Sequence, residues 1–172
     1  MTNQFHADRG LDAGPANGPR LLLADHHRGI EEAYRRMLAS IYADDARDLI
    51  RDFRSFERAI LEHLAAEEDV ILPAYALEAP QDAAQIRADH ARIREALTRA
   101  GIDTDLHTMR EHAMKALIEA LRTHAAHEDE RMYPWAQIHL PLTSRRGLFV
   151  RLGRSLRTLA GIAERAATPV AR

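Results

Sequence analysis

The sequence predicts an all-α fold: an antiparallel, up-down-up-down four-helix bundle with an additional C-terminal amphipathic helix. Three observations predict it. The 172 residues suit one domain, and only three are valine whereas Ala, Leu, Arg and Glu are abundant, so helix formers dominate. Residues 30–72, 81–100 and 102–133 contain neither glycine nor proline. Apolar residues recur along these stretches at helical spacing.

Four segments carry such an apolar stripe: residues 20–42, 46–72, 81–100 and 105–133. A break at residues 43–45 is needed because one helix over residues 30–72 would be roughly 64 Å long. Asp45 is suited to cap the start of the second segment. The short connections make successive helices antiparallel neighbours.

Composition divides the chain into three parts. Residues 1–19, polar and rich in Gly and Pro, are expected to form a flexible leader, and residues 20–140 the bundle. Residues 141–172 hold seven arginines and one acid, a net charge of +6. Leucines share one face of this predicted helix, together with Ala163 (Leu148, Leu152, Leu156, Leu159). We expect it to dock on the acidic bundle or on a second copy in a homodimer, rather than to contact a membrane.

Charge and cysteine content exclude several classes of protein. The net charge of −2 argues against nucleic acid as a partner. Because cysteine is absent, disulfides, thiolate zinc sites, iron–sulfur clusters and cysteine nucleophiles are excluded. No apolar run reaches the length of a signal peptide or a membrane span, so we expect a cytoplasmic protein. Any metal must be bound by nitrogen and oxygen, and ten histidines are available.

An internal repeat places histidines and glutamates in the apolar stripes. Residues 63–73, with His-x-x-x-Glu and a final Pro73, match residues 124–134, which end at Pro134. Residues 23–30 match residues 86–93 in the same way, around one histidine each. Positions i and i+4 project from one face of a helix. In an antiparallel bundle, four imidazoles and two carboxylates therefore converge at one level, and the two prolines end the helices that carry the glutamates.

Burying six ionisable groups in a small core costs several kcal/mol unless they neutralise one another or share a cation. Six nitrogen and oxygen donors with twofold pseudosymmetry suit two divalent transition ions joined by two bridging carboxylates. Imidazole with carboxylate favours Fe, Mn or Zn over Mg or Ca.

Four segments, HRGIEEAY, HLAAEEDVILP, DHARIREAL and HAAHEDERMYP, resemble the haemerythrin-like, or HHE cation-binding, domain family over residues 21–135. The resemblance implies a four-helix bundle holding two non-haem iron ions, with zinc or manganese as substitutes. It implies these ligands: His27, His63, Glu67, His90, His124 and Glu128. His26 is the rival of His27. We favour His27 because Leu23, Ile30 and Tyr34 reproduce around it the apolar frame of His90.

The chain departs from the oxygen-carrying members at Arg94, where those proteins have a second histidine. One metal is then a ligand short unless His26, Glu68 or His127 supplies it. The departure argues against reversible oxygen carriage and leaves a coordination position for water, peroxide or another small ligand.

The family resemblance implies a sensor, scavenger or reservoir that binds O2, NO or peroxide. Two alternatives remain. One is a di-iron enzyme acting on peroxide or oxygen, or in nitrosative-stress repair of iron–sulfur centres. The other is a zinc-bound scaffold without small-molecule chemistry.

Overall fold

The computed structural model describes residues 19–167, and side chains within residues 25–164. Over this range the chain forms seven helices and no strand: α1 (Pro19–Tyr42), α2 (Ala46–Val70), α3 (Leu72–Glu78), α4 (Pro80–Asp105), α5 (Glu111–Glu130), α6 (Met132–His139) and α7 (Leu142–Ala167). The all-α prediction is confirmed. The predicted leader, apart from Pro19, and the last five residues of the C-terminal segment lie outside the described residues.

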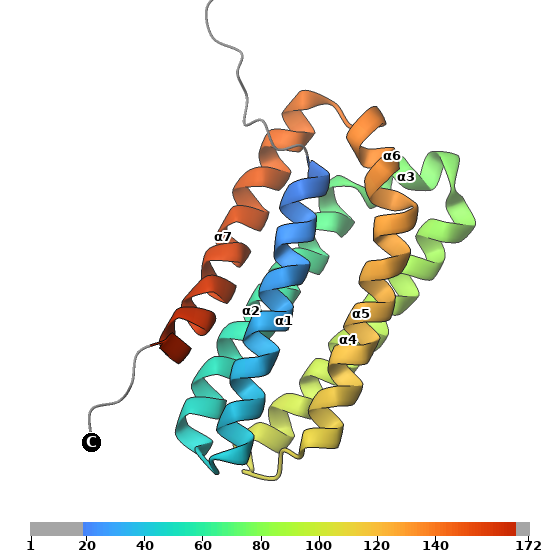
Figure 1. The fold of residues 1–172 in the computed structure, drawn as a ribbon. Helices are drawn as coiled ribbons and strands as arrows, with labels where there is room; N and C mark the ends of the chain where they lie inside the picture. Colours follow the sequence, from blue (N-terminus) through green and yellow to red (C-terminus); the bar gives the residue numbers. More distant parts are fainter. Residues whose placement is uncertain (1–18, 168–172) are drawn as a thin grey trace, which may run out of the picture.

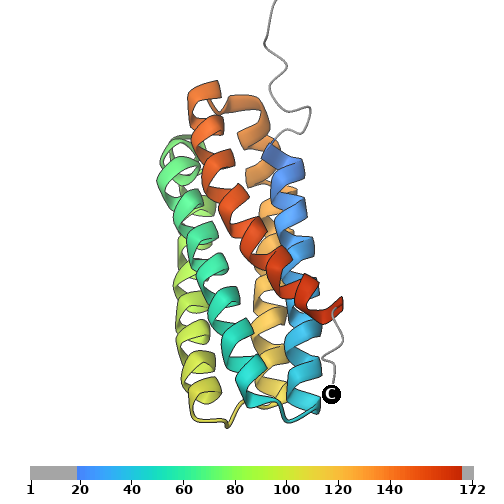
Figure 2. The ribbon, with the colours of Figure 1, turned by 90° about the vertical axis from the view of Figure 1, so that its left-hand side faces the viewer.

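Four long helices, α1, α2, α4 and α5, lie side by side and alternate in direction (Figure 1). The short helices α3 and α6 stand at one end of this bundle. α7 runs obliquely across the face formed by α1 and α2 (Figure 2) and packs on both. None of the helices within residues 19–167 combines the length and apolar character needed to cross a membrane.

The turn between α1 and α2 lies where the sequence predicts it. The Asp45 side chain accepts a hydrogen bond of 3.0 Å from the Asp48 amide and caps α2. Asp44, just before it, has a φ of 53°, a left-handed conformation that Asp tolerates better than most residues.

The boundary between the third and fourth predicted segments is wrong. α4 continues through Gly101 to Asp105, and α5 begins only at Glu111. A glycine inside a helix costs only about 1 kcal/mol, and the chain turns at His107, whose φ is 57°. With these bounds α4 ends fifteen residues after His90, and α5 begins thirteen residues before His124. The two histidines can therefore lie at the same height.

The two ligand-bearing helices end earlier than predicted, at Val70 and Glu130. Pro73 and Pro134 belong instead to the short helices that follow, α3 and α6. Proline cannot donate to the carbonyl four residues earlier, so neither long helix can continue unbroken past it.

Two clusters of buried apolar side chains fill the bundle, one above the other. The larger contains Phe53, Phe56 and Ile60, and it continues through Ile93 and Leu121. The smaller lies toward the α3 and α6 end and contains these residues among others: Ala66, Ile71, Leu72, Ile86, Met132, Tyr133 and Leu152. Along α4 and α5, the repeated histidines and glutamates fall between the residues of one cluster and those of the other, and on α2 His63 and Glu67 lie where the two clusters meet, at Leu64 and Ala66. They therefore form a polar layer inside an apolar core.

α7 buries the apolar face that the sequence predicts. Leu148, Leu152 and Leu159 are fully buried, whereas Leu156 and Ala163 are only half-buried. Ile162 and the polar Ser155 complete the buried face, and the sequence pattern did not identify either. α7 thus packs on α1 and α2 as a fifth long helix.

Candidate metal centre

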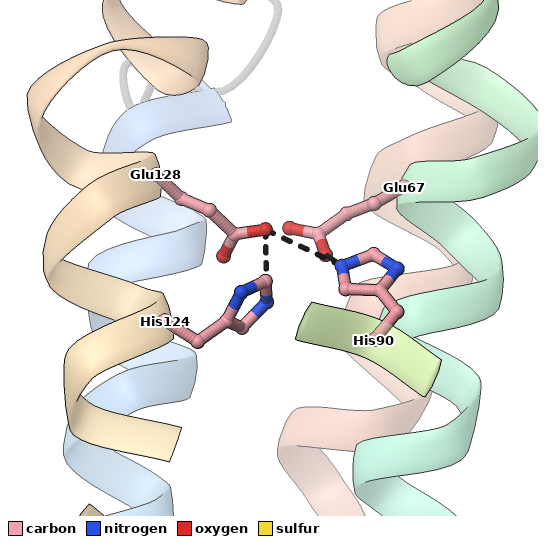
Figure 3. A group of neighbouring side chains, drawn as sticks. All are labelled: Glu67, His90, His124 and Glu128. Atoms are coloured by element: carbon pink, nitrogen blue, oxygen red, sulfur yellow. Dashed lines mark ion pairs between the residues drawn. The ribbon is translucent and has the colours of Figure 1, made fainter. Parts of the chain in front are cut away.

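The polar layer gathers side chains from all four long helices. α1 supplies His27, α2 supplies His63 and Glu67, α4 supplies His90, and α5 supplies His124 and Glu128. Figure 3 shows the two glutamates facing each other from α2 and α5, with His90 and His124 below them. The structure therefore brings together all six residues that the repeat singles out.

These six residues form two overlapping groups whose donor atoms lie within 4.8 Å of one another: Glu67, His90, His124 and Glu128 in the first, and His27, His63 and Glu128 in the second. Within the first group, His124 Nε2 is 3.0 Å from Glu128 Oε1, and His90 Nε2 is 3.5 Å from Glu67 Oε2. His63 Nε2 lies 3.2 Å from Glu67 Oε1. Because Glu128 belongs to both groups, its carboxylate can connect two cations.

Unsatisfied polar atoms show that the first group suits a cation. Among the described residues, the buried side-chain atoms without a hydrogen bond include five of this group: Glu67 Oε2, His90 Nε2, His124 Nδ1, His124 Nε2 and Glu128 Oε1. A buried polar atom without a partner costs about 1–3 kcal/mol. A cation bound among these atoms removes that cost, and imidazole with carboxylate is a donor set that suits iron, manganese and zinc.

The charges of the cluster also favour a bound cation. Burial opposes protonation of His90, but the nearby carboxylates of Glu128 and Glu67, 3.6 and 3.5 Å from its Nε2, outweigh it and raise the pKa of His90 to about 10. Burial alone would raise the pKa of the Glu67 carboxyl, yet His63 and His90 hold that pKa well below its usual value. The two carboxylates thus attract positive charge into the layer, as a proton on His90 or as a metal ion.

Tyr133 is a member of this layer that sequence reasoning missed. Its hydroxyl is fully buried, bonds to Glu67 Oε1, and lies 2.8 Å from Glu128 Oε2 and 3.4 Å from His63 Nε2. Burial, then the charges of Glu128 and Glu67, raise the pKa of this phenol well above 10, so it remains protonated. The available signal was its position: it replaces the apolar Leu72 of the first repeat copy.

A second layer of carboxylates holds the outer ring nitrogens. Glu68, directly after Glu67, lies 2.8 Å from His90 Nδ1 through its Oε1. Asp129, directly after Glu128, pairs with His27 Nδ1 at 3.4 Å. Carboxylates in this position orient metal-binding imidazoles and make them stronger donors. Glu68 was a candidate ligand in the sequence, whereas Asp129 was not among the candidates.

The three further candidates, His26, Glu68 and His127, belong to neither group of donors in the described residues. Arg94 binds Glu68 through two hydrogen bonds of 2.7 and 2.9 Å and so holds it on the outer side of His90. His127 lies 2.8 Å from Asp82. His26 Nε2 lies 2.7 Å from Ser155 of α7. Of the two adjacent histidines, the structure places His27 with His63 and Glu128.

Two surface pockets approach the layer on either side of α5. One, of about 320 Å³, lies between α1 and α5 and is lined by His27, Ile30, Leu121 and Asp129 among others. The other, of about 380 Å³, lies between α4 and α5 and reaches His124 and His127. Each group of donors therefore contributes one histidine to the lining of a surface pocket.

Comparison with protein families matches residues 19–136 to the hemerythrin HHE cation binding domain. Domains of this family bind metal ions, typically iron, and small ligands such as O2. Searches of curated proteins and of solved structures returned no match. The matched region covers more than half of the chain and contains every residue of the two donor groups. The chain belongs to the hemerythrin HHE cation-binding family.

Proposed function

We propose that this chain is a non-haem di-iron protein whose centre binds a small diatomic or peroxide ligand, as a sensor, scavenger or reservoir. The observation that carries the proposal is the pair of buried donor groups that share Glu128. A single cation would need only one of them.

In this proposal Glu67, His90, His124 and Glu128 hold one iron ion, and His27, His63 and Glu128 hold the other. Iron supplies an electron-rich centre that binds and exchanges electrons with O2, NO or peroxide. The protein supplies a layer enclosed by apolar side chains on both sides, which restricts water. Glu68 and Asp129 fix the rings of His90 and His27 through their Nδ1 atoms.

Tyr133 has a separate role in this proposal. Its one hydroxyl proton is within reach of both Glu67 and Glu128, so it orients the two carboxylates toward the centre. It is also the proton donor nearest to them that stays protonated at neutral pH.

The test begins with the metal content of protein produced in iron-supplemented medium. We expect two iron ions per chain and, after anaerobic reduction, a new visible absorption band on adding NO, O2 or hydrogen peroxide. Two zinc ions under the same conditions would favour the scaffold. Continuous consumption of peroxide, rather than one equivalent bound, would favour an enzyme.

A matched pair of variants identifies the site. Glu128→Ala removes the shared carboxylate, whereas Glu130→Ala changes an exposed glutamate two residues later on the same helix. We expect the first variant to lose iron and the second to retain it. Full iron content in Glu128→Ala would contradict the proposal.

A further inference from the structure

α7 lies beyond the matched family domain, which ends at residue 136, and yet one of its side chains reaches the edge of the candidate metal centre. Ser155 is fully buried at the contact of α7 with α1 and α2. Its hydroxyl donates a hydrogen bond of 2.7 Å to the Ala59 carbonyl of α2 and lies 2.7 Å from His26 Nε2 of α1. The Ser155 side chain therefore connects α7 to both α1 and α2.

These two contacts determine the tautomer of His26. A serine hydroxyl has one proton, and here it is donated to the Ala59 carbonyl. The oxygen must then accept the second bond, so His26 carries its proton on Nε2 and directs this N–H at α7. The Nε2 of His26 is thereby committed to α7, while its Nδ1 is buried without a hydrogen-bond partner and belongs to neither group of donors.

His26 in turn contacts a proposed ligand. Its ring stacks on the ring of His63, with the centroids 4.1 Å apart and the planes 17° from parallel. His63 Nε2 faces Glu67 and Tyr133. Because the rings are stacked, a rotation of the His26 ring forces the His63 ring to move.

The packing of α7 holds Ser155 firmly in this position. Leu152 and Leu159, about one turn to either side of it, are fully buried. α7 also crosses α1 closely at Gly29, where an added Cβ would lie 3.2 Å from Leu159. The small residue at position 29 thus allows α7 to approach within reach of His26.

We propose that Ser155 is a positioning residue of the metal centre: it fixes the His26 ring and, through the stacking of that ring, sets the orientation of His63. This inference rests on the proposed function, in which His63 is a ligand. It assigns to α7, which the family domain does not include, a part in building the site.

The first test uses the metal-free full-length chain and the matched variants Ser155→Thr and Ser155→Val, which have similar bulk and differ by the hydroxyl. We expect ring-nitrogen NMR to show His26 protonated on Nε2 in the wild type and in Ser155→Thr. In Ser155→Val we expect loss of this single tautomer and a shift of the His63 ring signals. Thr158→Ala removes a hydroxyl that bonds to Arg154 of its own helix, so it should leave both histidines unchanged.

The second test adds Co²⁺ as a spectroscopic probe. We expect Ser155→Val to bind Co²⁺ about tenfold more weakly than Ser155→Thr, with an altered visible spectrum, as is typical when an outer partner of a ligand is removed. If the wild type binds no Co²⁺ while the NMR result holds, the proposed metal site is wrong and the Ser155–His26–His63 arrangement stands. Identical His63 signals and identical Co²⁺ spectra in the two variants would overturn the inference.

Discussion

In the first copy of the repeat, Glu67 is followed by Glu68, and in the second copy Glu128 is followed by Asp129. In each, the first acid faces the interior and the second reaches the outer nitrogen of a histidine on another helix. The surroundings differ. Glu68 is half-buried and clamped by Arg94, whereas Asp129 is 45% exposed and holds His27 at a longer distance. The six donors correspond between the two copies, but Glu128 belongs to both donor groups and Glu67 to only one, and the outer partners differ as well.

The second difference lies five residues after each glutamate. The first copy has Leu72, which packs in the apolar cluster, and the second has Tyr133, whose hydroxyl bonds to the glutamates of both copies. The hydrogen bonds around the donors therefore differ between the two copies, as does the sharing of the two glutamates. The two proposed metal positions are therefore not equivalent. Four predictions test the site, in order of decreasing effect.

The largest effect is expected from the two glutamates. Glu128→Ala should abolish binding at both positions, since it belongs to both donor groups, whereas Glu67→Ala should spare more of the second position. Loss of tightly bound metal should lower the melting temperature of Glu128→Ala by about 10 °C. Metal analysis with calorimetry measures both. Equal metal loss in the two variants would mean that both carboxylates bridge equally.

Tyr133→Phe should lower the free energy of unfolding by about 1–3 kcal/mol, because two buried carboxylates lose their shared donor. The iron content should stay the same while the visible spectrum shifts. Tyr75→Phe is the matched control: its hydroxyl bonds to Asp82, outside both donor groups, so stability falls without a spectral change. An unchanged visible spectrum in Tyr133→Phe would show that Tyr133 does not influence the metal centre.

The outer carboxylates provide a smaller test. Glu68→Gln should weaken metal binding by about tenfold, and Asp129→Asn by less, because Asp129 is more exposed and holds its histidine at a longer distance. Competition with a chelator measures both affinities. A larger loss in Asp129→Asn would reverse the order that the geometry predicts.

The smallest effect concerns pH. The pKa of His90 in the metal-free fold, about 10, exceeds its ordinary value of about 6.5, so its contribution to stability is complete below pH 6.5 and is lost as pH rises toward 10. We expect the unfolding free energy of the metal-free chain to fall by at least about 1 kcal/mol over this range. His90→Gln should remove this decline, which denaturant titrations at several pH values can measure. A flat profile in the wild type would show that His90 is not held protonated.

Much of the fold followed from local patterns. The Asp45 cap and the helical stripes are properties of short stretches, and the repeated His-x-x-x-Glu motif places polar donors within the apolar stripes of two helices. The boundary near Gly101 could not be predicted in this way. A glycine weakens a helix by less than tertiary packing strengthens it, and α4 continues past it to bury Thr104.

The site was only partly predictable for a similar reason. Donors that repeat along the chain can be recognised by their spacing, but Asp129, Tyr133 and Ser155 act across helices. Ser155 contacts His26 over 129 positions of sequence, and no periodicity connects the two. In the sequence, Arg94 is recognised only as a residue in the place of a histidine. Its contact with Glu68 becomes apparent only in the structure, where the two side chains lie next to each other.

The most direct test is anomalous diffraction from crystals of the iron-loaded protein at the iron absorption edge. The account predicts two neighbouring peaks, one among Glu67, His90, His124 and Glu128 and the other among His27, His63 and Glu128. A layer without such peaks, or iron bound only at the surface, would contradict it.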